Sequence, residues 1–331
     1  MARSINMMSN IKVIAIVGAT ASGKTELASF LAGKFNGELI SADSRQVYIG
    51  MDIGTAKIDE RRKTKDESNE IHLIDVVTPD KEYNVADFLR DAGRLIKEIS
   101  ARGHLPIIVG GTGLWVEALL EGYRPAPKVS QKIRKELLRE LKNDGLGSLV
   151  GKLRKVDKLA YQKVDLKNPR RVLRALEVFL STGKSIFEQR KKKASQYDYI
   201  LIGPKVSRDE LYKRIDQRVE KMFKAGLEKE VRDLYKKFGK VEALNAIGYK
   251  EFFPQTRACL PARQGFAADS TDTPSAGKVK DKIKKNTRNL AKRQMTWWRR
   301  KSVNWVSTKV MAVRLVKKWL KSTNNQVPRS K

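Results

Sequence analysis

The sequence predicts an α/β fold: a parallel sheet flanked by helices, with an inserted all-helical unit. Short apolar runs alternate with helical patterns over residues 11–116, which is typical of parallel strands joined by crossover helices. Residues 128–196 are rich in Lys and Arg, helical in pattern and free of convincing strands. With 331 residues, the chain is long enough for both units.

Each expected strand is a short apolar run that ends in a polar or glycine-rich loop. The runs cover residues 11–17, 38–41, 71–76, 105–109 and 197–204, and the last of them returns to the sheet. Ligands of such folds bind at the carboxyl ends of the strands, so the loops that follow these runs are the expected site.

Helical spacing of apolar residues predicts a helix over 24–35. A later helix begins after Ser207, which forms a capping box with Glu210, and its first segment ends near Gly226. A basic helix is expected over 281–301. The predicted organisation is an α/β core (1–122 and 197–322), a helical insertion domain (123–196), a flexible surface loop (254–280) and a disordered tail (323–331).

Positive charge is the second strong signal in the composition. Lys and Arg number 69 against 37 Asp and Glu, which gives a formal net charge of +32. Because self-repulsion at such a charge destabilises a folded chain, we expect a polyanionic partner. Nucleic acid is favoured over an anionic membrane surface. The alternative is a lysine bias that only decorates a solvated surface.

Several classes of protein are not expected. No run of about 18 apolar residues appears, so no membrane span is predicted, and the N-terminal residues lack the apolar centre of a secretory signal. Cys259 is the only cysteine, which leaves no disulfide framework. His72 and His104 cannot complete a zinc-finger ligand set with it. A reducing, cytoplasmic location is therefore expected.

Residues 18–25 read Gly-Ala-Thr-Ala-Ser-Gly-Lys-Thr, a complete G-x-x-x-x-G-K-[ST] phosphate-binding loop. The loop follows the first expected strand and opens the first expected helix, so the core is P-loop NTPase-like. The residues expected to bind phosphate are Gly18, Ala19, Thr20, Ala21, Ser22, Gly23, Lys24 and Thr25. Lys24 adds positive charge, and the Thr25 hydroxyl is placed to ligate a Mg²⁺ that bridges the phosphates. The loop does not by itself identify the phosphorylated ligand.

Two polar side chains follow other expected strands at the same edge of the sheet. Asp43 comes after 38–41, where a carboxylate can ligate Mg²⁺ through water or accept a proton from a nucleophile. Its alternative role is an Asx-type turn or a helix cap. Thr112, in the glycine-rich turn 110–113, could donate its hydroxyl to a phosphate or a base, or belong to a tight strand-to-helix turn.

Other signals are weaker when taken singly. Asp75 ends an apolar run, as does the Asp that holds Mg²⁺ in many nucleotide hydrolases, and this favours an ATPase or kinase. His72, in the same run, is expected to be a packed residue and not a ligand. Arg214 and Arg218 share a helix face and could reach a pyrophosphate, although from spacing alone pairing with acidic neighbours is favoured.

Two segments suit RNA. The segment 168–171, Asn-Pro-Arg-Arg, is expected to open a helix and to contact backbone phosphates. Trp297 and Trp298 precede two arginines and could stack on RNA bases, although a core-facing Trp297 is at least as well supported.

Nine segments of the chain carry a joint resemblance. They are GATASGKT (18–25), SADSRQVY (41–48), MDIGTAK (51–57), HLID (72–75), YNVADF (83–88), GGTG (110–113), NPRRVLRALE (168–177), AIGYKE (246–251) and KRQMTW (292–297). Together they resemble the tRNA dimethylallyltransferases, which place an isoprenoid group on the adenosine immediately 3′ of the anticodon. The match covers roughly residues 11–252 and 283–305, and the stretch 254–280 departs from it. The zinc finger that eukaryotic members tend to carry is absent from the sequence, so the chain looks like a bacterial or organellar-type member.

The resemblance implies a reaction and roles for particular residues. The phosphate loop would hold the pyrophosphate of dimethylallyl diphosphate rather than ATP, with Mg²⁺ near Thr25 and with Arg214 and Arg218 at the diphosphate. Asp43 matches the family's base for adenine N6, and Lys24 and Thr112 complete the expected catalytic set. The residues expected to contact tRNA are Asp43, Ser44, Arg45, Gln46, Thr112, Arg134, Asn168, Pro169, Arg170, Arg171 and Val172. The expected partners are the anticodon stem-loop of tRNA and dimethylallyl diphosphate, without a membrane, and the expected state is a monomer.

Three other interpretations stay open at this point. A P-loop nucleotide kinase would use the loop for ATP, and a free-adenylate isopentenyltransferase shares the first half of the motifs. Neither of these enzymes needs so much positive charge. A non-enzymatic RNA-binding module explains the charge but leaves the phosphate loop and Asp43 without a role.

Overall fold

The computed structural model describes residues 11–57, 71–122, 129–189, 195–253 and 275–322. The chain divides into two compact units. The core unit comprises Met1–Val116 with Gln196–Lys331, and the insertion unit comprises Glu117–Ser195. The insertion unit thus begins at Glu117, earlier than the expected residue 123.

The core unit is built on one six-stranded sheet in the order β3-β2-β4-β1-β5-β6, and all neighbouring strands are parallel. The strands are β1 (Ile11–Val17), β2 (Gly37–Ser41), β3 (Ile71–His72), β4 (Leu105–Gly110), β5 (Tyr197–Pro204) and β6 (Asn304–Val306). β1 lies between β4 and β5, with Ile14 opposite Ile107 on one side and Ile200 on the other. The predicted α/β fold with a parallel sheet is confirmed.

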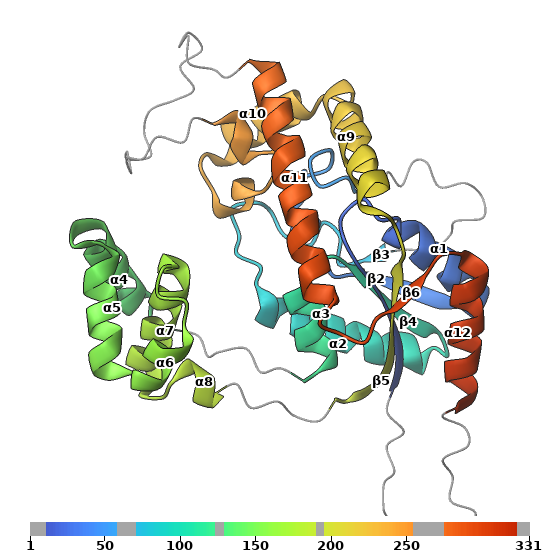
Figure 1. Ribbon diagram of the computed structural model, residues 1–331, viewed down its shortest axis with the longest axis horizontal. Helices are drawn as coiled ribbons and strands as arrows, with labels where there is room; N and C mark the ends of the chain where they lie inside the picture. The colour runs from blue at the N-terminus through green and yellow to red at the C-terminus, as the bar shows by residue number, and fades with distance from the viewer. Residues whose placement is uncertain (1–10, 58–70, 123–128, 190–194, 254–274, 323–331) are drawn as a thin grey trace, which may run out of the picture. The chain divides into compact units, whose positions relative to one another are not determined.

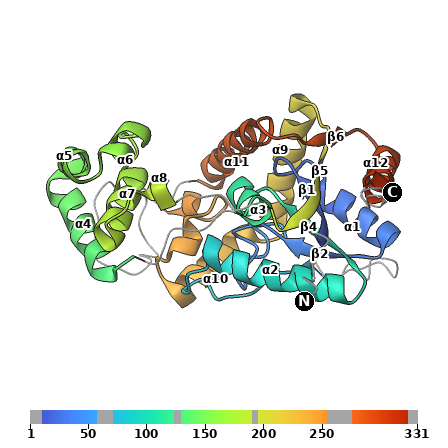
Figure 2. The same ribbon diagram turned by 90° about the horizontal axis from the view of Figure 1, so that it is seen from below.

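Helices cover both faces of this sheet (Figure 1). Successive residues of a strand point to opposite faces, so the alternate residues Ile14 and Ile16 share one face. They pack in an apolar core with α1 (Lys24–Phe35) and α12 (Lys309–Ser322). The opposite face is covered by α2 (Val85–Ala101), as Figure 2 shows.

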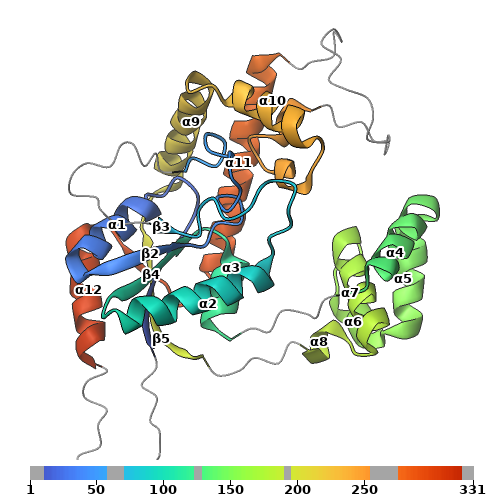
Figure 3. The same ribbon diagram turned by 180° about the vertical axis from the view of Figure 1, so that it is seen from behind.

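Three further helices lie beyond the carboxyl ends of the strands (Figure 3). They are α9 (Arg208–Lys224), α10 (Leu227–Phe238) and α11 (Ala276–Trp298). Ser207 caps α9 by accepting the Glu210 N–H at 3.3 Å, as its sequence predicts. The shorter elements of this unit are α3 (Gly113–Leu120), which crosses the unit boundary, η2 (Glu242–Asn245) and η3 (Lys250–Phe252).

Ion pairs hold α11 against α9. Arg288 of α11 bonds Asp216, and Lys280 and Lys284 bond Glu220 at 2.8 and 2.7 Å. Arg288, which belongs to the expected basic helix, is thus held between the two helices by its ion pair with Asp216. These ion pairs hold α9 and α11 together, and both helices contribute side chains to the cavity described below.

One carboxylate fastens the segment 51–57 to α10. Glu230 accepts the backbone N–H groups of residues 52–54 at 2.7–3.1 Å and the Tyr249 hydroxyl at 2.7 Å. Gly54 leaves room for this arrangement, since a Cβ there would lie 2.4 Å from the Tyr249 ring. The segment is thereby held at the edge of the site.

The insertion unit consists of helices over its described residues. They are α4 (Gln131–Asn143), α5 (Gly145–Val156), α6 (Lys158–Lys163), α7 (Pro169–Thr182) and α8 (Ile186–Gln189). Asn168 caps α7 by accepting the Arg171 N–H at 3.3 Å, and Pro169 occupies the first helical position. Leu149 and Leu153 of α5 form the centre of its apolar core.

Two strands differ from the sequence-based expectation. The strand expected over 71–76 ends at His72, because Leu73 and Asp75 have left-handed φ angles of 63° and 55°. The following residues instead bond the segment 46–47, with the Asp75 N–H donating to Gln46 O at 3.1 Å. β6, which adds a sixth strand beside β5, was not expected.

The basic helix also begins earlier than expected. α11 starts at Ala276, inside the stretch 254–280 that was expected to be a flexible loop, and it buries Val279. Residues 254–274 and the expected tail 323–331 lie outside the described residues. None of the helices in the described part of the chain has the length and apolar character that a bilayer crossing requires.

Both histidines of the chain contact one carboxylate at the start of β2. Glu38 bonds His72 at 2.8 Å and His104 at 2.6 Å, and the Arg102 guanidinium donates to both of its oxygens. Burial disfavours the ionised carboxylate, but the hydrogen bonds from these three partners outweigh it and lower the pKa of Glu38 to about 2. His72 is thus a packed, paired residue, as expected.

The Glu38 cluster predicts a defined acid dependence of stability. A carboxyl whose pKa falls on folding stabilises the protein above its unfolded pKa of 4.5, and this stability is lost as the pH falls towards about 2. We expect Glu38→Gln to lower the free energy of unfolding by about 1–3 kcal/mol near pH 7. Urea unfolding should show the difference from wild type shrinking below about pH 4.5. Glu98→Gln, which removes an exposed pair with Arg94, is the control and should change little.

Candidate active site

The phosphate-binding motif forms a tight loop between β1 and α1. Gly18 and Gly23 have φ angles of 142° and 88°, which a residue with a Cβ rarely adopts. Ala21 also lies in the left-handed region, at φ 61°, which is costly for a non-glycine residue and is typical of binding loops. These positions give the loop the tightly turned backbone that is typical of anion-binding loops.

Lys24 is the first residue of α1 and faces the loop. Its Nζ donates to the carbonyl of Ala19 at 2.6 Å. Burial lowers the pKa of the Lys24 ammonium to about 8; Asp43 opposes this change and Arg218 adds to it. The cation is therefore poorly compensated, and a bound anion would stabilise it.

The loop opens into a cavity of about 270 Å³ at the carboxyl ends of the strands. The cavity is lined by residues from β2, β4, α1, α9, α11 and the segment 51–57. They include Thr20, Ala21, Gly23, Lys24, Thr25, Ser41, Asp43, Gln46, Thr55, Gly110, Gly111, Arg214, Arg218 and Gln294. The structure thus gathers the sequence-predicted phosphate loop, carboxylate and arginine pair around one space.

Asp43 forms a turn and also lies at the cavity. Its Oδ1 accepts the Arg45 N–H at 2.9 Å, which is an Asx turn. The carboxylate also lines the cavity. Oδ2 accepts no hydrogen bond from the described residues, so one oxygen orients the group while the other can accept a proton.

Thr112 is tied to the same segment as Asp43. Its Oγ1 accepts the Ser44 N–H at 3.3 Å, and the neighbouring Ala42 N–H donates to Val109 O at 2.8 Å. A Cβ at Gly110 would lie 2.3 Å from Ala42 O, which explains the glycine. The hydroxyl of Thr112 keeps its own hydrogen for another acceptor.

The two arginines of α9 differ in their partners. Arg218 donates to Thr20 Oγ1 at 3.3 Å and to Thr55 O at 3.1 Å, and burial lowers its pKa while Asp43 opposes the change. Arg214 bonds Glu210 at 2.7 Å and also lines the cavity. Pairing with local acidic neighbours therefore holds for Arg214 and is wrong for Arg218.

Residues 45 and 46, expected to contact tRNA, already have partners in the core unit. Arg45 reaches Ala243 O at 3.5 Å. Gln46 accepts the Ser41 hydroxyl at 3.1 Å and donates to Thr55 O at 3.4 Å. Gln46 also lines the cavity, so its amide belongs to the wall beside Asp43.

Sequence reasoning missed Gln294 and Thr55 as members of the site. Gln294 accepts the Thr20 N–H and donates to Gly111 O, and Thr55 supplies a carbonyl to Arg218. Both lie in segments that carried the resemblance, 292–297 and 51–57. That resemblance was the only signal in the sequence, since neither residue stands in a motif with an assignable chemistry of its own.

Asp75 does not take part in this site. Its carboxylate bonds Lys57, which also donates to Tyr48 O at 2.6 Å and to Asp52 at 2.8 Å. It is absent from the residues that line the cavity. The weak likeness of Asp75 to the magnesium-binding Asp of nucleotide hydrolases is therefore not supported, because the strand stops at His72 and the Asp75 carboxylate is bonded to Lys57.

In the insertion unit, one predicted cation, Arg134, lies near a buried carboxylate together with Arg174. Glu177 is 2% exposed and lies 3.7 Å from Arg134 and 3.2 Å from Arg174. Arg170 and Arg171 are exposed at the start of α7. Val172, by contrast, is fully buried. Its expected contact with tRNA is wrong, because the helical turn carries its side chain into the core.

The two neighbouring tryptophans have opposite environments. Trp298 is buried at 1% exposure, whereas Trp297 is 38% exposed. Trp297 lies over Gly113, where a Cβ would come within 2.5 Å of the indole ring. The core-facing residue is thus Trp298, and Trp297 borders the turn that carries Thr112.

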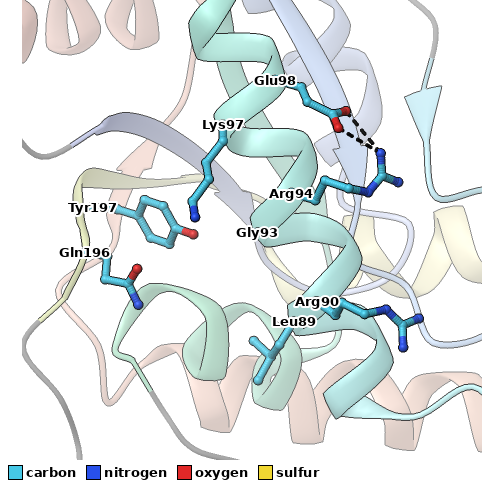
Figure 4. A pocket seen from close by; sticks show the side chains of 8 residues that line it. All are labelled: Leu89, Arg90, Gly93, Arg94, Lys97, Glu98, Gln196 and Tyr197. Carbon is cyan, nitrogen blue, oxygen red and sulfur yellow. Dashed lines mark hydrogen bonds and ion pairs between the residues drawn. The ribbon is translucent and has the colours of Figure 1, made fainter.

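A second, larger hollow of about 450 Å³ lies between α2 and the start of β5 (Figure 4). Arg90 and Arg94 line it, but they bond Asp91 and Glu98 on their own helix. β5 starts opposite Ile11, at the other end of β1 from the phosphate loop. The hollow therefore has no part in the phosphate site.

The cavity fits a magnesium ion that arrives with a phosphate ligand. The described residues hold no cluster of three or more His, Cys, Asp or Glu side chains suited to a metal ion. The oxygen-bearing side chains that line the cavity include the Thr25 hydroxyl and the Asp43 carboxylate. Mg²⁺ commonly takes one or two protein oxygens, several waters and phosphate oxygens, which matches this donor set.

Comparison with known proteins identifies the family. A family model described as IPP transferase matches residues 46–301. The chain belongs to the IPP transferase family. The phosphate loop of this family member precedes the matched segment, and Asp43 does so too, whereas Thr112, both α9 arginines and Gln294 lie within it.

Curated relatives and solved structures agree with the family. The tRNA dimethylallyltransferases of Oceanobacillus iheyensis and Geobacter sulfurreducens are each 40% identical to this chain. The alignments cover 88% and 90% of this chain and 90% and 92% of the relatives. The crystal structure of the tRNA isopentenylpyrophosphate transferase from Bacillus halodurans gives a TM-score of 0.66 at 36% identity, over 95% of this chain and 98% of that one.

A more distant solved structure has the same fold. It is a eukaryotic dimethylallyltransferase acting on tRNA, with a TM-score of 0.69 at 29% identity. The match covers 86% of this chain and 69% of the eukaryotic chain. The resemblance to tRNA dimethylallyltransferases inferred from the nine sequence segments is thus confirmed.

The lowered pKa of Lys24 predicts how diphosphate affinity changes with pH. The unbound ammonium loses its proton above about pH 8, whereas a bound anion holds it, so binding takes up a proton in that range. Affinity for an unreactive alkyl diphosphate, whose own last ionisation lies near about pH 6, should fall as the pH rises through about 8. Calorimetry in two buffers of different ionisation enthalpy measures both the affinity and the proton uptake.

Lys24→Arg is the matched control for this titration, because a guanidinium stays charged across the whole range. The diphosphate affinity of this variant, whatever its absolute value, should not change as the pH rises through about 8. A wild-type affinity that stays level between about pH 7 and about pH 9.5 would contradict the assignment.

Proposed function

We propose that this chain transfers the dimethylallyl group of dimethylallyl diphosphate to N6 of the adenosine immediately 3′ of the anticodon in tRNA. The products are N6-isopentenyladenosine and diphosphate. The observation that carries the proposal is the single cavity that brings the phosphate loop, Arg218 and the Asp43 carboxylate together. Relatives named tRNA dimethylallyltransferase, 40% identical over most of the chain, support the same substrates.

The donor side of the cavity suits departure of a diphosphate. The bond between the allylic C1 and the diphosphate oxygen breaks, and its electron pair leaves with the diphosphate. The phosphate loop with Lys24, together with Arg218, would stabilise the charge that develops there. A Mg²⁺ held by the Thr25 hydroxyl and the phosphates would neutralise more of that charge when bound.

The acceptor side suits a weak nitrogen nucleophile. The N6 lone pair of adenine is delocalised into the ring, so attack on C1 is aided when a base takes an N6 proton. Asp43 presents a carboxylate oxygen to the cavity while its other oxygen is fixed by Arg45 N–H. Thr112, beside it, can donate its hydroxyl to a ring nitrogen of the base or to a phosphate. A base inside tRNA must leave its stack to reach such a cavity.

The positive charge supports tRNA as the acceptor in preference to a free nucleotide. The net charge of +32 is far beyond what a diphosphate pocket uses. Arg134, Arg170 and Arg171 lie exposed on the insertion unit, where they can contact phosphates. A tRNA substrate would also suit the cytoplasmic location that the lone cysteine predicts. That the protein is a monomer stays a prediction.

A nucleotide kinase of this fold is less well supported. Such an enzyme commonly holds Mg²⁺ with an Asp at the end of a strand, and the Asp75 carboxylate is bonded to Lys57 instead. The family match and the charge also count against it.

The proposed reaction and its base can be tested together. Incubation with tRNA, dimethylallyl diphosphate and Mg²⁺ should yield tRNA that contains isopentenyladenosine by mass spectrometry, without consumption of ATP. Asp43→Asn keeps the oxygen that accepts Arg45 N–H but removes the base. We expect its single-turnover rate to fall by roughly 10²–10⁴-fold with both substrates still bound.

Asp80→Asn is the matched control, because Asp80 is an exposed carboxylate whose ion pair is with its neighbour Lys81 at 3.8 Å and which does not line the cavity. It should transfer at the wild-type rate. Wild-type turnover by Asp43→Asn would leave Asp43 as a turn residue alone, and ATP hydrolysis coupled to turnover would favour a kinase or ATPase.

The charge predicts a steep salt dependence of tRNA binding. Each phosphate contact should add about −0.7 to −0.9 to the slope of log K against log salt. Arg170→Gln with Arg171→Gln should flatten that slope and raise the tRNA KM, while donor affinity stays level because both residues lie in the insertion unit. Filter binding over a salt series measures the slope.

The control for this pair is Lys229→Gln with Arg232→Gln on α10, whose cations bond Asp233 and Glu228 on the same helix. This double variant removes the same amount of charge, but from residues that are paired within their own helix. The slope of log K against log salt for tRNA should therefore stay near that of wild type. A wild-type tRNA affinity indifferent to salt would favour the free-nucleotide alternative.

A further inference from the structure

The side chain of Gln294 joins the loops that carry the two halves of the site. Its Oε1 accepts the Thr20 N–H at 2.8 Å, and its Nε2 donates to Gly111 O at 3.0 Å. Thr20 belongs to the phosphate loop after β1, and Gly111 follows β4, the strand next to β1. A single amide therefore joins the phosphate loop to the turn that carries Thr112.

Glutamine is the side chain that this bridge requires. One partner offers a hydrogen and the other a lone pair, so a long amide satisfies both, and the same partners fix which way the amide points. The fit is close, because a Cβ at Gly111 would lie 2.3 Å from Gln294 Nε2. Methionine has a similar length without the polar atoms, and glutamate keeps the acceptor but loses the donor.

The place of Gln294 is set by helices and not by the loops that it joins. α11 is fixed to α9 by the pair Arg288–Asp216 and by an apolar cluster that includes Ala291. α9 also carries Arg218, which bonds the Thr20 hydroxyl at 3.3 Å. Two helices thus hold the phosphate loop, one by its backbone and the other by a side chain.

The bridge continues to the proposed base. Thr112, next to Gly111, accepts the Ser44 N–H, and Ser44 follows Asp43 directly. We propose that Gln294 is a positioning residue that fixes the distance between the phosphate loop, and so C1 of the bound donor, and the Asp43 side where N6 attacks. This inference rests on the proposed prenyl transfer.

Two variants separate the bonds. Gln294→Met removes both of them, and Gln294→Glu keeps the bond from Thr20 N–H but turns an oxygen towards Gly111 O. Because misplacing reacting groups by about 1 Å can cost about 100-fold, we expect each to lower the single-turnover rate by about 10–100-fold at saturating donor and tRNA. The tRNA dissociation constant should stay within about two-fold of wild type.

The pH profile distinguishes positioning from packing. A carboxyl placed against Gly111 O has a raised pKa, and once protonated it offers a donor and an acceptor as the amide does. The rate of Gln294→Glu relative to wild type should therefore recover as the pH is lowered from about 8 to about 6. The relative rate of Gln294→Met should stay flat. Asn289→Asp, the same amide-to-acid change at an exposed position of α11, should match wild type throughout.

Each outcome decides the inference. A Gln294→Met rate at saturation within about two-fold of wild type overturns it. The inference is also overturned if Gln294→Met loses thermal stability and affinity for both donor and tRNA but keeps the wild-type rate at saturation. Gln294 would then only stabilise the packing of the core unit. If Gln294→Met does not fold, a flat relative pH profile of Gln294→Glu is the overturning result. Absence of prenylated tRNA with the wild-type chain would instead overturn the proposed function and this inference with it.

Discussion

The site depends on two buried cations, Lys24 and Arg218, that lie at one edge of the sheet. Like charges in a partly buried space repel, and the lowered pKa values of Lys24 and Arg218 reflect that burial. Asp43 is the carboxylate that opposes both shifts. It therefore balances the cations in the absence of a ligand, and a bound diphosphate would take over this role. Once the diphosphate balances Lys24 and Arg218, the Asp43 carboxylate would be available to accept a proton.

Much of the fold could be predicted because its signals are local. β1 and β5 are apolar runs with the predicted bounds, and Ser207 caps α9 as its spacing indicates. The failures have physical causes that lie outside the local pattern. β3 stops at His72 since Leu73 and Asp75 turn into the left-handed region. β6 has three residues, too few for a period, and exists because it pairs with β5.

The site was predictable where a motif fixes the chemistry. The phosphate loop needs its glycines at fixed spacing, and Asp43 follows a strand at the same edge of the sheet. Gln294 could not be found in this way, because its two partners are distant in sequence and nothing local marks a bridging amide. Val172 was misassigned since it follows two exposed arginines, yet one helical step of about 100° turns its side chain into the core.

The distance along the chain between Thr20 and Gln294, 274 residues, has a consequence for synthesis on the ribosome. At a synthesis rate of about 5–20 residues per second, Gln294 is added roughly a quarter of a minute to a minute after the phosphate loop that it bonds. β6 and α12, which complete one face of the sheet, are translated later still. During that interval the insertion unit, contiguous over 117–195, can already close its own core. The unit rich in exposed cations would thus be finished before the catalytic one.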